Sequence, residues 1–325
     1  MIITVTLNTA IDKTLSVPNF RLGRRHRTVE QTTMPGGKGV NVARVLKALG
    51  QPVIATGFTG GATGTRIVEQ LTQLSVLSDF VRIREESRTN TAVIDPTTGE
   101  QTEINERGPK VSEQEVELFV DKLLYLAKGA SMCVFAGSLP RDVDTDIYAK
   151  LIRELRRLGV ATIVDADGDP LRRAVRAEPD VISPNVLEAE ELVGHEFNDG
   201  LDDWAIAARE LWELGAREAI MTMADGCFAR MRATEPGGEP CLYRVRLGSP
   251  ALEPRATVGS GDAFLAGFVA ARYNGLGTEE SLVHAVACGA QSTQHLGAGL
   301  IDPAQVERLA AEVEVERPAL SAEVG

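Results

Sequence analysis

Short strand-like segments alternate with helical stretches along most of this chain, and this alternation restricts its fold more than any other feature. The opening 2–7 is rich in β-branched residues, and apolar residues recur at helical spacing from Val42 until Gly50. Further strands are expected at 52–57, 132–136, 161–164, 181–183 and 219–223, and further helices at 67–77, 113–128, 147–158, 203–214, 262–273 and 279–296. This order predicts βαβ units, and therefore an α/β fold with a mainly parallel sheet and helices on both faces.

Two segments, 12–33 and about 80–108, interrupt the alternation. Both are polar, rich in β-branched residues and without helical period. Within the second, 88–95 and 100–106 alternate like a hairpin around the turn at 97–99. We interpret both segments as strands of a small accessory sheet outside the α/β body, and long surface loops are the alternative.

The net charge of the chain argues against some classes of binding partner. With 34 Lys and Arg against 46 Asp and Glu, the net charge is −12, which repels nucleic acids and anionic lipids, so we expect neither as a partner. The four cysteines form no C-x-x-C pair, the start of the chain does not resemble a leader, and no apolar run approaches the ~20 residues that span a bilayer. We therefore expect a reduced, cytoplasmic protein, with 314–325 as a loosely held tail.

Three glycine clusters each precede a helical stretch, at 36–39, 60–64 and 259–262. A helix N-terminus offers free N–H groups and the positive end of a dipole, and glycine lets an anion approach the backbone closely. One such turn could serve packing alone. Three in one acidic chain favour phosphate binding.

Neither common nucleotide-binding pattern explains these glycines. The P-loop pattern needs Ser or Thr after its lysine, but Lys38 is followed by Gly39. The dinucleotide pattern fails at 259–264, where Phe264 takes the place of the third glycine. The phosphate site must therefore be of another kind.

Asp262 closes the third glycine cluster at the start of a predicted helix. A carboxylate there is stabilised as the anion and would lie beside N–H groups that can hold a phosphoryl group. A base beside an anion-binding turn suits phosphoryl transfer to a hydroxyl. The alternative, a simple helix-capping aspartate, is common.

Taken together, the motifs resemble the PfkB (ribokinase-like) carbohydrate kinase family over residues 1 to about 302. They occur in the order that this family uses: Asn8-x-Ala10-x-Asp12, Gly36-Gly37-Lys38-Gly39-Val40-Asn41, Arg88-Thr89-Asn90, Gly137-Ser138-Leu139-Pro140, Pro184-Asn185-x-x-Glu188 and Gly259-Ser260-Gly261-Asp262. The resemblance is to the branch that acts on hexose phosphates, the 1-phosphofructokinases and tagatose-6-phosphate kinases. It implies one kinase domain over 1–325, with three α/β/α layers and a β-sheet lid whose strands come from 12–33 and 80–108.

The resemblance also assigns roles to single residues. Asp262 would take the proton from the acceptor hydroxyl, while the backbone of Gly259, Ser260 and Gly261 would hold the transferring phosphoryl group. The sugar would bind to Asp12, Gly36, Gly37, Asn41 and Asn90, and its own phosphate to Lys38, Arg88, Ser138 and Arg27, with Arg24 and Arg25 beside it. ATP would lie near Thr222, Ala224, Gly226 and Thr257, with Mg²⁺ held by Asn185 and Glu188 through water. Relatives often form dimers through the lid sheet, so a homodimer is expected.

The largest departure from the family pattern is Met223, which stands where the first glycine of a nucleotide-binding loop is usual. We expect this change to bear on nucleotide affinity or donor preference. Asp262 and its glycines are intact, so the sequence does not indicate an inactive enzyme.

Three hypotheses follow. The first is an ATP-dependent kinase of a ketohexose monophosphate: fructose 1-phosphate, tagatose 6-phosphate or fructose 6-phosphate. The second keeps the fold but takes an unphosphorylated sugar or a nucleoside, which Lys38 and Arg88 argue against. The third is a non-catalytic sugar-phosphate sensor, supported only by the altered loop around Met223.

Overall fold

The computed structural model describes residues 1–198, 200–233, 239–248 and 254–318. Its largest element is an eleven-stranded sheet, with β6 (Val81–Ile83) beside the end of β4. In sheet order the other strands are β15 (Val313–Glu316), β14 (Cys241–Leu247), β13 (Gly226–Met231), β12 (Ala219–Met223), β11 (Val181–Ile182), β10 (Ala161–Asp165), β9 (Met132–Ala136), β1 (Ile2–Thr6), β4 (Val53–Gly60) and β5 (Leu77–Ser78). Neighbours from β12 to β5 are parallel, and β13, β14 and β15 extend the sheet in antiparallel fashion.

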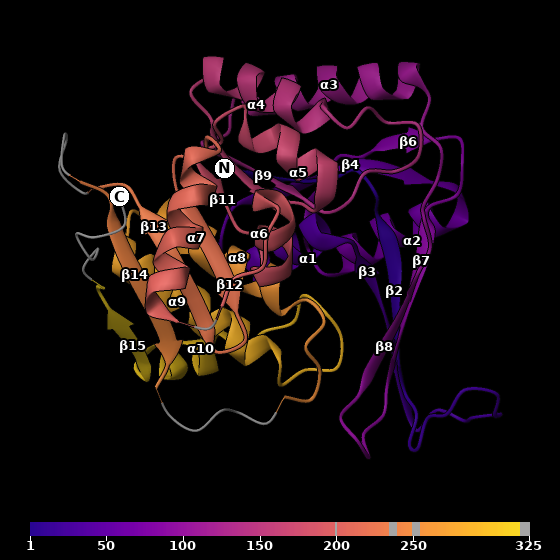
Figure 1. Ribbon diagram of the computed structural model, residues 1–325. Helices are drawn as coiled ribbons and strands as arrows, with labels where there is room; N and C mark the ends of the chain where they lie inside the picture. Colours follow the sequence, from indigo (N-terminus) through magenta and orange to yellow (C-terminus); the bar gives the residue numbers. More distant parts are fainter. Residues whose placement is uncertain (199, 234–238, 249–253, 319–325) are drawn as a thin grey trace.

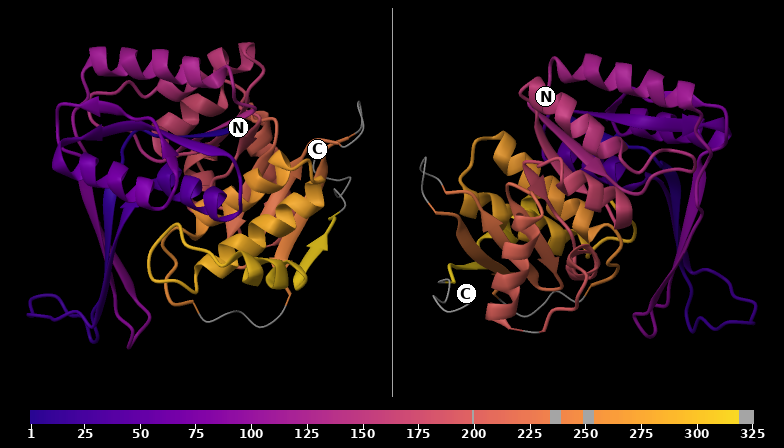
Figure 2. Two further views of the ribbon diagram at one scale, coloured as in Figure 1. Left: turned by 180° about the vertical axis from the view of Figure 1, so that it is seen from behind. Right: turned by 45° about the horizontal axis from the view of Figure 1, so that its top comes forward.

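Helices cover both faces of this sheet (Figures 1 and 2). One face packs against α3 (Glu113–Ala127), α4 (Ile147–Arg157), α5 (Gly168–Val175), α6 (Val186–Val193) and α7 (Leu201–Glu213). The other packs against α1 (Lys38–Ala48), α2 (Gly61–Gln73), α8 (Ser260–Tyr273) and α9 (Thr278–Ser292), and α10 (Pro303–Ala310) lies on α9. The α/β fold with three layers, expected from the alternation, is confirmed.

The fully buried strand β1 shows why the sheet needs two layers of helices. Its side chains alternate between faces, so Ile3 and Val5 join the core beneath α3–α7 while Ile2 joins the core beneath α1 and α8. A parallel strand that is apolar on both faces must be covered on both.

The lid is a separate four-stranded sheet in the order β3 (Glu30–Gly36), β2 (Ala10–Ser16), β7 (Arg88–Ile94) and β8 (Gln101–Asn105). Figure 1 shows its strands projecting from the body, with the loop between β2 and β3 at their far end. The expected hairpin is present, because β7 and β8 pair antiparallel across a turn at 95–100.

In the lid and the tail, three details differ from the sequence-based expectations. Residues 81–83, placed in the lid, form β6 and pair with β4 in the body, since their apolar side chains join the core under α3. Residues 17–29, placed among the lid strands, form the loop between β2 and β3. Residues 314–316, placed in the tail, pair with β14 as part of β15, while 319–325 lie outside the described residues. Among the residues that the structure describes, no helix is long and apolar enough to cross a membrane.

Candidate active site

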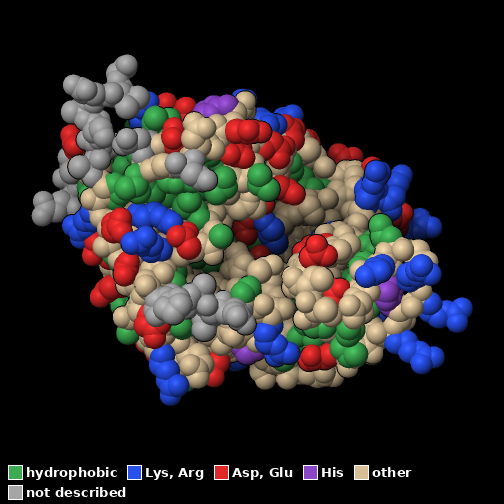
Figure 3. All heavy atoms as spheres, turned by 60° about the horizontal axis from the view of Figure 1, so that its bottom comes forward, with side chains coloured by type: hydrophobic (Ala, Val, Ile, Leu, Met, Phe, Trp, Pro, Cys, Tyr) green, Lys and Arg blue, Asp and Glu red, His purple; other side chains and the backbone are tan. Residues whose placement is uncertain are grey.

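The chain places polar residues together where the parallel strands end. Asn8 follows β1, Ser138 follows β9, Asp165 ends β10, and Asn185 follows β11. Ligands of open α/β sheets bind at the carboxyl ends of the strands. Figure 3 shows a hollow between the body and the lid, in which acidic and basic side chains lie together.

The third glycine cluster forms the N-terminus of α8. Gly259 precedes the helix at φ +79°, and a Cβ there would lie 2.4 Å from the Cβ of Ala298, so this turn requires glycine. Asp262 lies in the first turn and is buried. Burial, followed by the charge of Asp165, raises the pKa of Asp262 to about 7, against the opposing effects of Lys38 and Asn41. A carboxyl group with such a pKa can exchange a proton near neutrality.

Asn41 on α1 reaches across to this carboxyl group. Its Nδ2 donates a hydrogen bond of 2.8 Å to Asp262 Oδ2, and both side chains are buried. The amide oxygen of Asn41 has no hydrogen-bond partner among the described residues. Asn41 therefore fixes one oxygen of Asp262 and keeps its own amide oxygen as an acceptor for a ligand.

Lys38, predicted to bind the substrate's phosphate, lies at the start of α1 and pairs with two carboxylates. Its Nζ contacts Asp165 Oδ1 at 2.8 Å and Glu188 Oε1 at 3.4 Å, and these carboxylates raise its pKa above the ordinary value despite its burial. Among the described contacts, none joins Lys38 to Arg88 or Ser138. The ammonium group therefore lies on the side of the site that holds Glu188.

Asp12 and Asn90, both predicted to bind the sugar, lie on adjacent lid strands and define the predicted sugar end of the site. Asn90 Nδ2 donates to Asp12 Oδ1 at 2.9 Å, while Asn90 Oδ1 has no partner among the described residues. Burial raises the pKa of Asp12, opposed by Asn90 and then by Arg88. A Cβ on Gly36 would lie 1.9 Å from Asp12 Oδ2, so the glycine makes room for this carboxylate.

Arg88 and Ser138, both predicted to bind the substrate's phosphate, meet around Asn8. Arg88 Nε donates to the carbonyl of Asn8 at 3.2 Å, and Asn8 Nδ2 donates to Ser138 Oγ at 3.2 Å. Arg88 Nη1 donates to the carbonyl of Glu106 at 3.0 Å. Asn8, a motif residue to which the sequence assigns no role, thus joins these two residues.

Arg27 is not brought to this end of the site within one chain. It lies with Arg24 and Arg25 in the exposed loop between β2 and β3. Ser16, where that loop begins, stands four residues beyond Asp12 along β2, or about 13 Å at the rise of an extended strand. Within one chain the strands therefore carry this loop away from the body, and the role of Arg27 as a ligand of the substrate's phosphate stays a prediction.

The predicted nucleotide side is formed by α6 and the β12–β13 hairpin. Asn185 and Glu188 form a capping box at the start of α6: Glu188 N donates to Asn185 Oδ1, and Asn185 N donates to Glu188 Oε2, both at 2.9 Å. The backbone of Thr222 bridges to Asn185, since Thr222 N donates to the carbonyl of Pro184 at 2.9 Å. Ala224 lies in the hairpin turn, and Thr257 accepts a hydrogen bond from Ser260 N at the start of α8.

The hairpin also explains how Met223 is accommodated. Its backbone is outside the left-handed region, so glycine is not required there, and its half-buried side chain packs against the core under α6 and α7. Gly226 is the constrained position: at φ +156°, a Cβ would lie 2.0 Å from the carbonyl oxygen of Val245. The backbone of this hairpin therefore does not require glycine at position 223.

The glycine cluster at 60–64 does not form a phosphate site. The N–H groups of Ala62 and Thr63 donate to the carboxylate of Glu86, at 3.2 and 2.5 Å. Because a side chain of this protein takes the anion position, the expectation of three phosphate-binding turns is wrong at this one.

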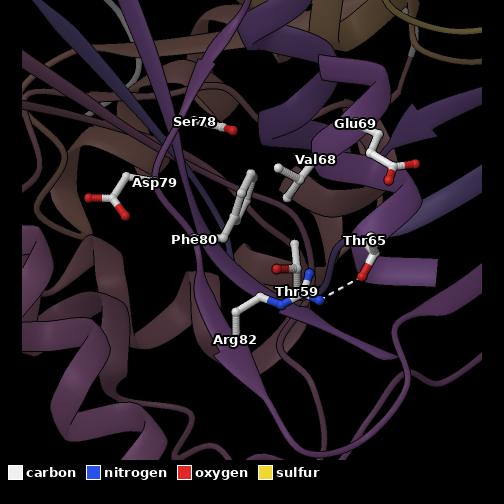
Figure 4. A pocket seen from close by; sticks show the side chains of 8 residues that line it. All are labelled: Thr59, Thr65, Val68, Glu69, Ser78, Asp79, Phe80 and Arg82. Carbon is white, nitrogen blue, oxygen red and sulfur yellow. Dashed lines mark hydrogen bonds between the residues drawn. The ribbon is translucent and has the colours of Figure 1, made fainter. Parts of the chain in front are cut away.

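Two cavities in the described part of the molecule lie elsewhere and contain none of the predicted site residues. One, of about 380 Å³, lies beside α2, where Arg82 Nη2 donates to Thr65 Oγ1 at 2.6 Å (Figure 4). The other, of about 480 Å³, lies where α1 and α8 end.

Fold and site together indicate an α/β kinase with a β-sheet lid. In it, a buried carboxyl group lies at a helix N-terminus, with the predicted sugar end and the acidic residues around Lys38 near it. The pfkB family carbohydrate kinase model matches residues 4–305, and the chain belongs to this family.

The chain is 33% identical over 317 residues to a 1-phosphofructokinase of Borreliella burgdorferi, covering 97% of this chain and 98% of the relative. It is 31% identical over 318 residues to a tagatose-6-phosphate kinase of Staphylococcus epidermidis, covering 97% and 99%. The crystal structure of phosphofructokinase-2 from Escherichia coli in complex with fructose-6-phosphate is similar at a TM-score of 0.83, with 26% identity over 95% of this chain and 98% of that one.

Proposed function

We propose that this protein is a kinase that transfers the γ-phosphoryl group of ATP to a hydroxyl of a ketohexose monophosphate, giving the bisphosphate and ADP. The observation that carries the proposal is the buried Asp262 at the N-terminus of α8, with a pKa near 7 and one oxygen held by Asn41. We place the whole reaction within one kinase domain over 1–325, with the lid closing over the sugar.

In the proposed reaction, the acceptor hydroxyl gives its proton to Asp262. Its oxygen forms a bond to the γ-phosphorus as the bond from that phosphorus to the β,γ-bridging oxygen breaks, and ADP leaves with that electron pair. The N–H groups at 259–261 would stabilise the charge of the transferring phosphoryl group, where each donor is worth ~10²–10³ in rate. Lys38 would act at the same phosphoryl group, since it lies close enough to Asp262 to lower its pKa.

The acceptor's hydroxyls would bind between Asp12 and Asn90, where the Asp12 carboxylate and the unpartnered Asn90 Oδ1 can accept hydrogen bonds. Its phosphate would bind to Arg88 and Ser138 beside Asn8. Two of the three guanidinium nitrogens of Arg88 donate to carbonyls, and the third has no partner among the described residues, so it can donate to an anion. The names of the relatives support this class of acceptor: 1-phosphofructokinase, tagatose-6-phosphate kinase, and a phosphofructokinase with bound fructose-6-phosphate.

The donor would be ATP with Mg²⁺, and the oxygen ligands present fit a hydrated magnesium ion. Glu188 and Asp165 both contact Lys38 and hence lie close together, and Mg²⁺ prefers carboxylates while it keeps several waters. Asn185 Oδ1 is used by the capping box, so Asn185 would position Glu188 rather than bind the metal directly. When bound, Mg²⁺ would neutralise charge on the ATP phosphates.

We also propose a homodimer through the lid sheet. Among the described residues, the lid strand β8 is unpaired along its outer edge and exposes Ile104 to 63%, and the loop between β2 and β3 exposes Val29 to 69%. Burial by a second copy of the chain would account for the exposure of these apolar side chains in one chain. Light scattering after gel filtration should give twice the mass of the chain, and a monomer would contradict this assembly.

A substrate panel tests the proposed reaction. Fructose 1-phosphate, tagatose 6-phosphate, fructose 6-phosphate, fructose and adenosine would each be offered with Mg²⁺ and ATP, and ADP would be measured by a coupled assay. We expect turnover with at least one of the three hexose phosphates and much less with fructose or adenosine. Higher turnover with fructose or adenosine would support a kinase of unphosphorylated acceptors, and no turnover with any acceptor would support a sensor.

A further inference from the structure

The proposed reaction assigns no role to Arg44, a buried charged residue close to the site. Arg44, two turns into α1, is only 5% exposed. Burial lowers the pKa of its guanidinium to about 10, against the opposing charge of Asp12. A buried charge is costly unless it is paired and hydrogen-bonded. The partners of Arg44 therefore indicate what this charge does.

The guanidinium of Arg44 contacts two segments that are far apart in the chain. Nη1 donates to the carbonyl of Ala298 at 2.9 Å and to the carbonyl of Pro35 at 3.2 Å, and Nη2 contacts Met34 Sδ at 2.9 Å. Nε has no partner among the described residues. One side chain thus joins α1, the end of lid strand β3 and the loop after α9.

The β3 segment leads directly to the sugar end of the site. Pro35 precedes Gly36, whose backbone is pressed against the carboxylate of Asp12. The charge of Arg44 acts in the same direction as Asn90 and Arg88 on Asp12, because all three lower its pKa. Arg44 therefore holds the base of the lid and supports the ionised form of Asp12.

The loop after α9 leads to the phosphoryl-binding turn. Ala298 lies against Gly259, where a Cβ on the glycine would approach it to 2.4 Å. The next residue, Gly299, lies against both Arg44 Nη1 and the backbone of Asn41, which orients Asp262. A displacement of the Arg44 side chain would therefore be transmitted to the start of α8 through this loop.

We propose that Arg44 is a positioning residue that couples the sugar end of the site to the phosphoryl-binding turn. When the lid closes on the sugar, β3 moves Arg44 and the loop at 298–299 into the arrangement that receives the nucleotide. Each ligand should then tighten the binding of the other by the same factor. This inference rests on the proposed function, because it requires a sugar-phosphate site and a nucleotide site in one domain.

The test compares the unmodified protein with Arg44→Met and Arg44→Lys. Arg44→Met removes the donors and the charge but keeps much of the length, and Arg44→Lys keeps the charge with fewer donors. Arg272→Met is the matched control, because Arg272 is a partly buried arginine on α8 that pairs with Glu218 at 3.2 Å, far from Asp262. Thermal unfolding of all four proteins separates loss of stability from loss of coupling.

The readout is the affinity for the β,γ-methylene analogue of ATP, titrated calorimetrically with and without saturating fructose 1-phosphate, tagatose 6-phosphate or fructose 6-phosphate. In the unmodified protein and in Arg272→Met, the sugar phosphate should lower the dissociation constant of the analogue. In Arg44→Met that ratio should approach one, with kcat reduced about 10²-fold, the usual effect of a misplacement near 1 Å. Arg44→Lys should recover part of both.

A coupling ratio in Arg44→Met or Arg44→Lys equal to that of the unmodified protein would overturn the inference, as would a loss of the same size in Arg272→Met. If Arg44→Met does not fold, Arg44→Lys decides by the same criterion. A ratio of one in the unmodified protein would overturn the inference while leaving the kinase assignment intact. Failure of all three sugar phosphates to bind would instead contradict the proposed function, and the inference with it.

Discussion

Asn41 Nδ2 and Asp262 Oδ2 lie 2.8 Å apart in the buried interior of the site, although 221 positions separate them in the chain. Asn41 comes from α1 and Asp262 from α8, and both helices begin at the reaction site. The hydrogen bond therefore orients the proposed base and lowers its pKa against the larger effect of burial. Four predictions below depend on this carboxyl group or on residues near it.

The activity of the unmodified protein should have an acid limb near neutrality. Asp262 accepts a proton only as a carboxylate, and burial has raised its pKa to about 7. Below that pH the carboxyl group is protonated, so kcat/KM should fall tenfold per pH unit, and above it kcat/KM should level off. A profile that stays flat down to pH 5 would mean that no group with this pKa controls the reaction.

Asn41→Ala should move the acid limb to higher pH. The substitution removes a hydrogen bond that favours the ionised form of Asp262, so the pKa of this carboxyl group rises further. It also frees the carboxylate to rotate, which should reduce kcat by about 10–10². Asn274→Ala, at the exposed end of α8, is the control. An unchanged acid limb in Asn41→Ala would show that the bond does not tune Asp262.

Asp165→Asn should move the same limb in the opposite direction. The charge of Asp165 is the second cause, after burial, of the raised pKa of Asp262, so its removal should lower that pKa. Lys38 then loses the negative charge of its partner at 2.8 Å, and kcat should fall as the ammonium group is held less firmly. The acid limbs of Asn41→Ala and Asp165→Asn are each compared with that of the unmodified protein by pH titration of kcat/KM. A shift of both acid limbs in the same direction would contradict these assignments.

Met223→Gly, which restores the usual family residue, should weaken the fold without improving ATP binding. The half-buried methionine packs against the core, and its backbone does not need glycine. We expect a loss of about 1–3 kcal/mol in the free energy of unfolding, from lost packing and added backbone entropy. Chemical denaturation and the KM for ATP measure both effects. A marked fall in KM with unchanged stability would show instead that Met223 obstructs the nucleotide.

The fold and the centre of the site could be predicted from the sequence because their signals are local. Periodicity located the strands and helices, and the motifs containing Asp262, Asp12 and Glu188 each lie within a few residues. The confirmed family membership means that such motifs were informative together although each is short.

What the sequence could not supply are contacts between distant segments. The pairing of Lys38 with Asp165 joins positions 127 residues apart, and that of Arg44 with Ala298 joins positions 254 apart. At the turn at 60–64, the carboxylate of Glu86 takes the anion position. Glu86 lies outside the glycine motif, so the motif alone predicts phosphate binding there. The sequence also does not show how far the lid strands carry the loop with Arg27 from the body. Asp165 directly follows the strand expected at 161–164. This position at the end of a buried strand is the sequence signal that could have identified it as a site residue.

The most direct test of the account is Asp262→Asn, measured for turnover and for sugar-phosphate binding in the same preparation. The amide keeps the size and the contact with Asn41 but cannot accept the proton of the acceptor hydroxyl. We predict a fall in kcat of ~10²–10⁴, the range for loss of a general base. The dissociation constant of the preferred hexose phosphate should stay close to that of the unmodified protein. Near-normal turnover in Asp262→Asn would contradict the central claim that this carboxyl group is the base.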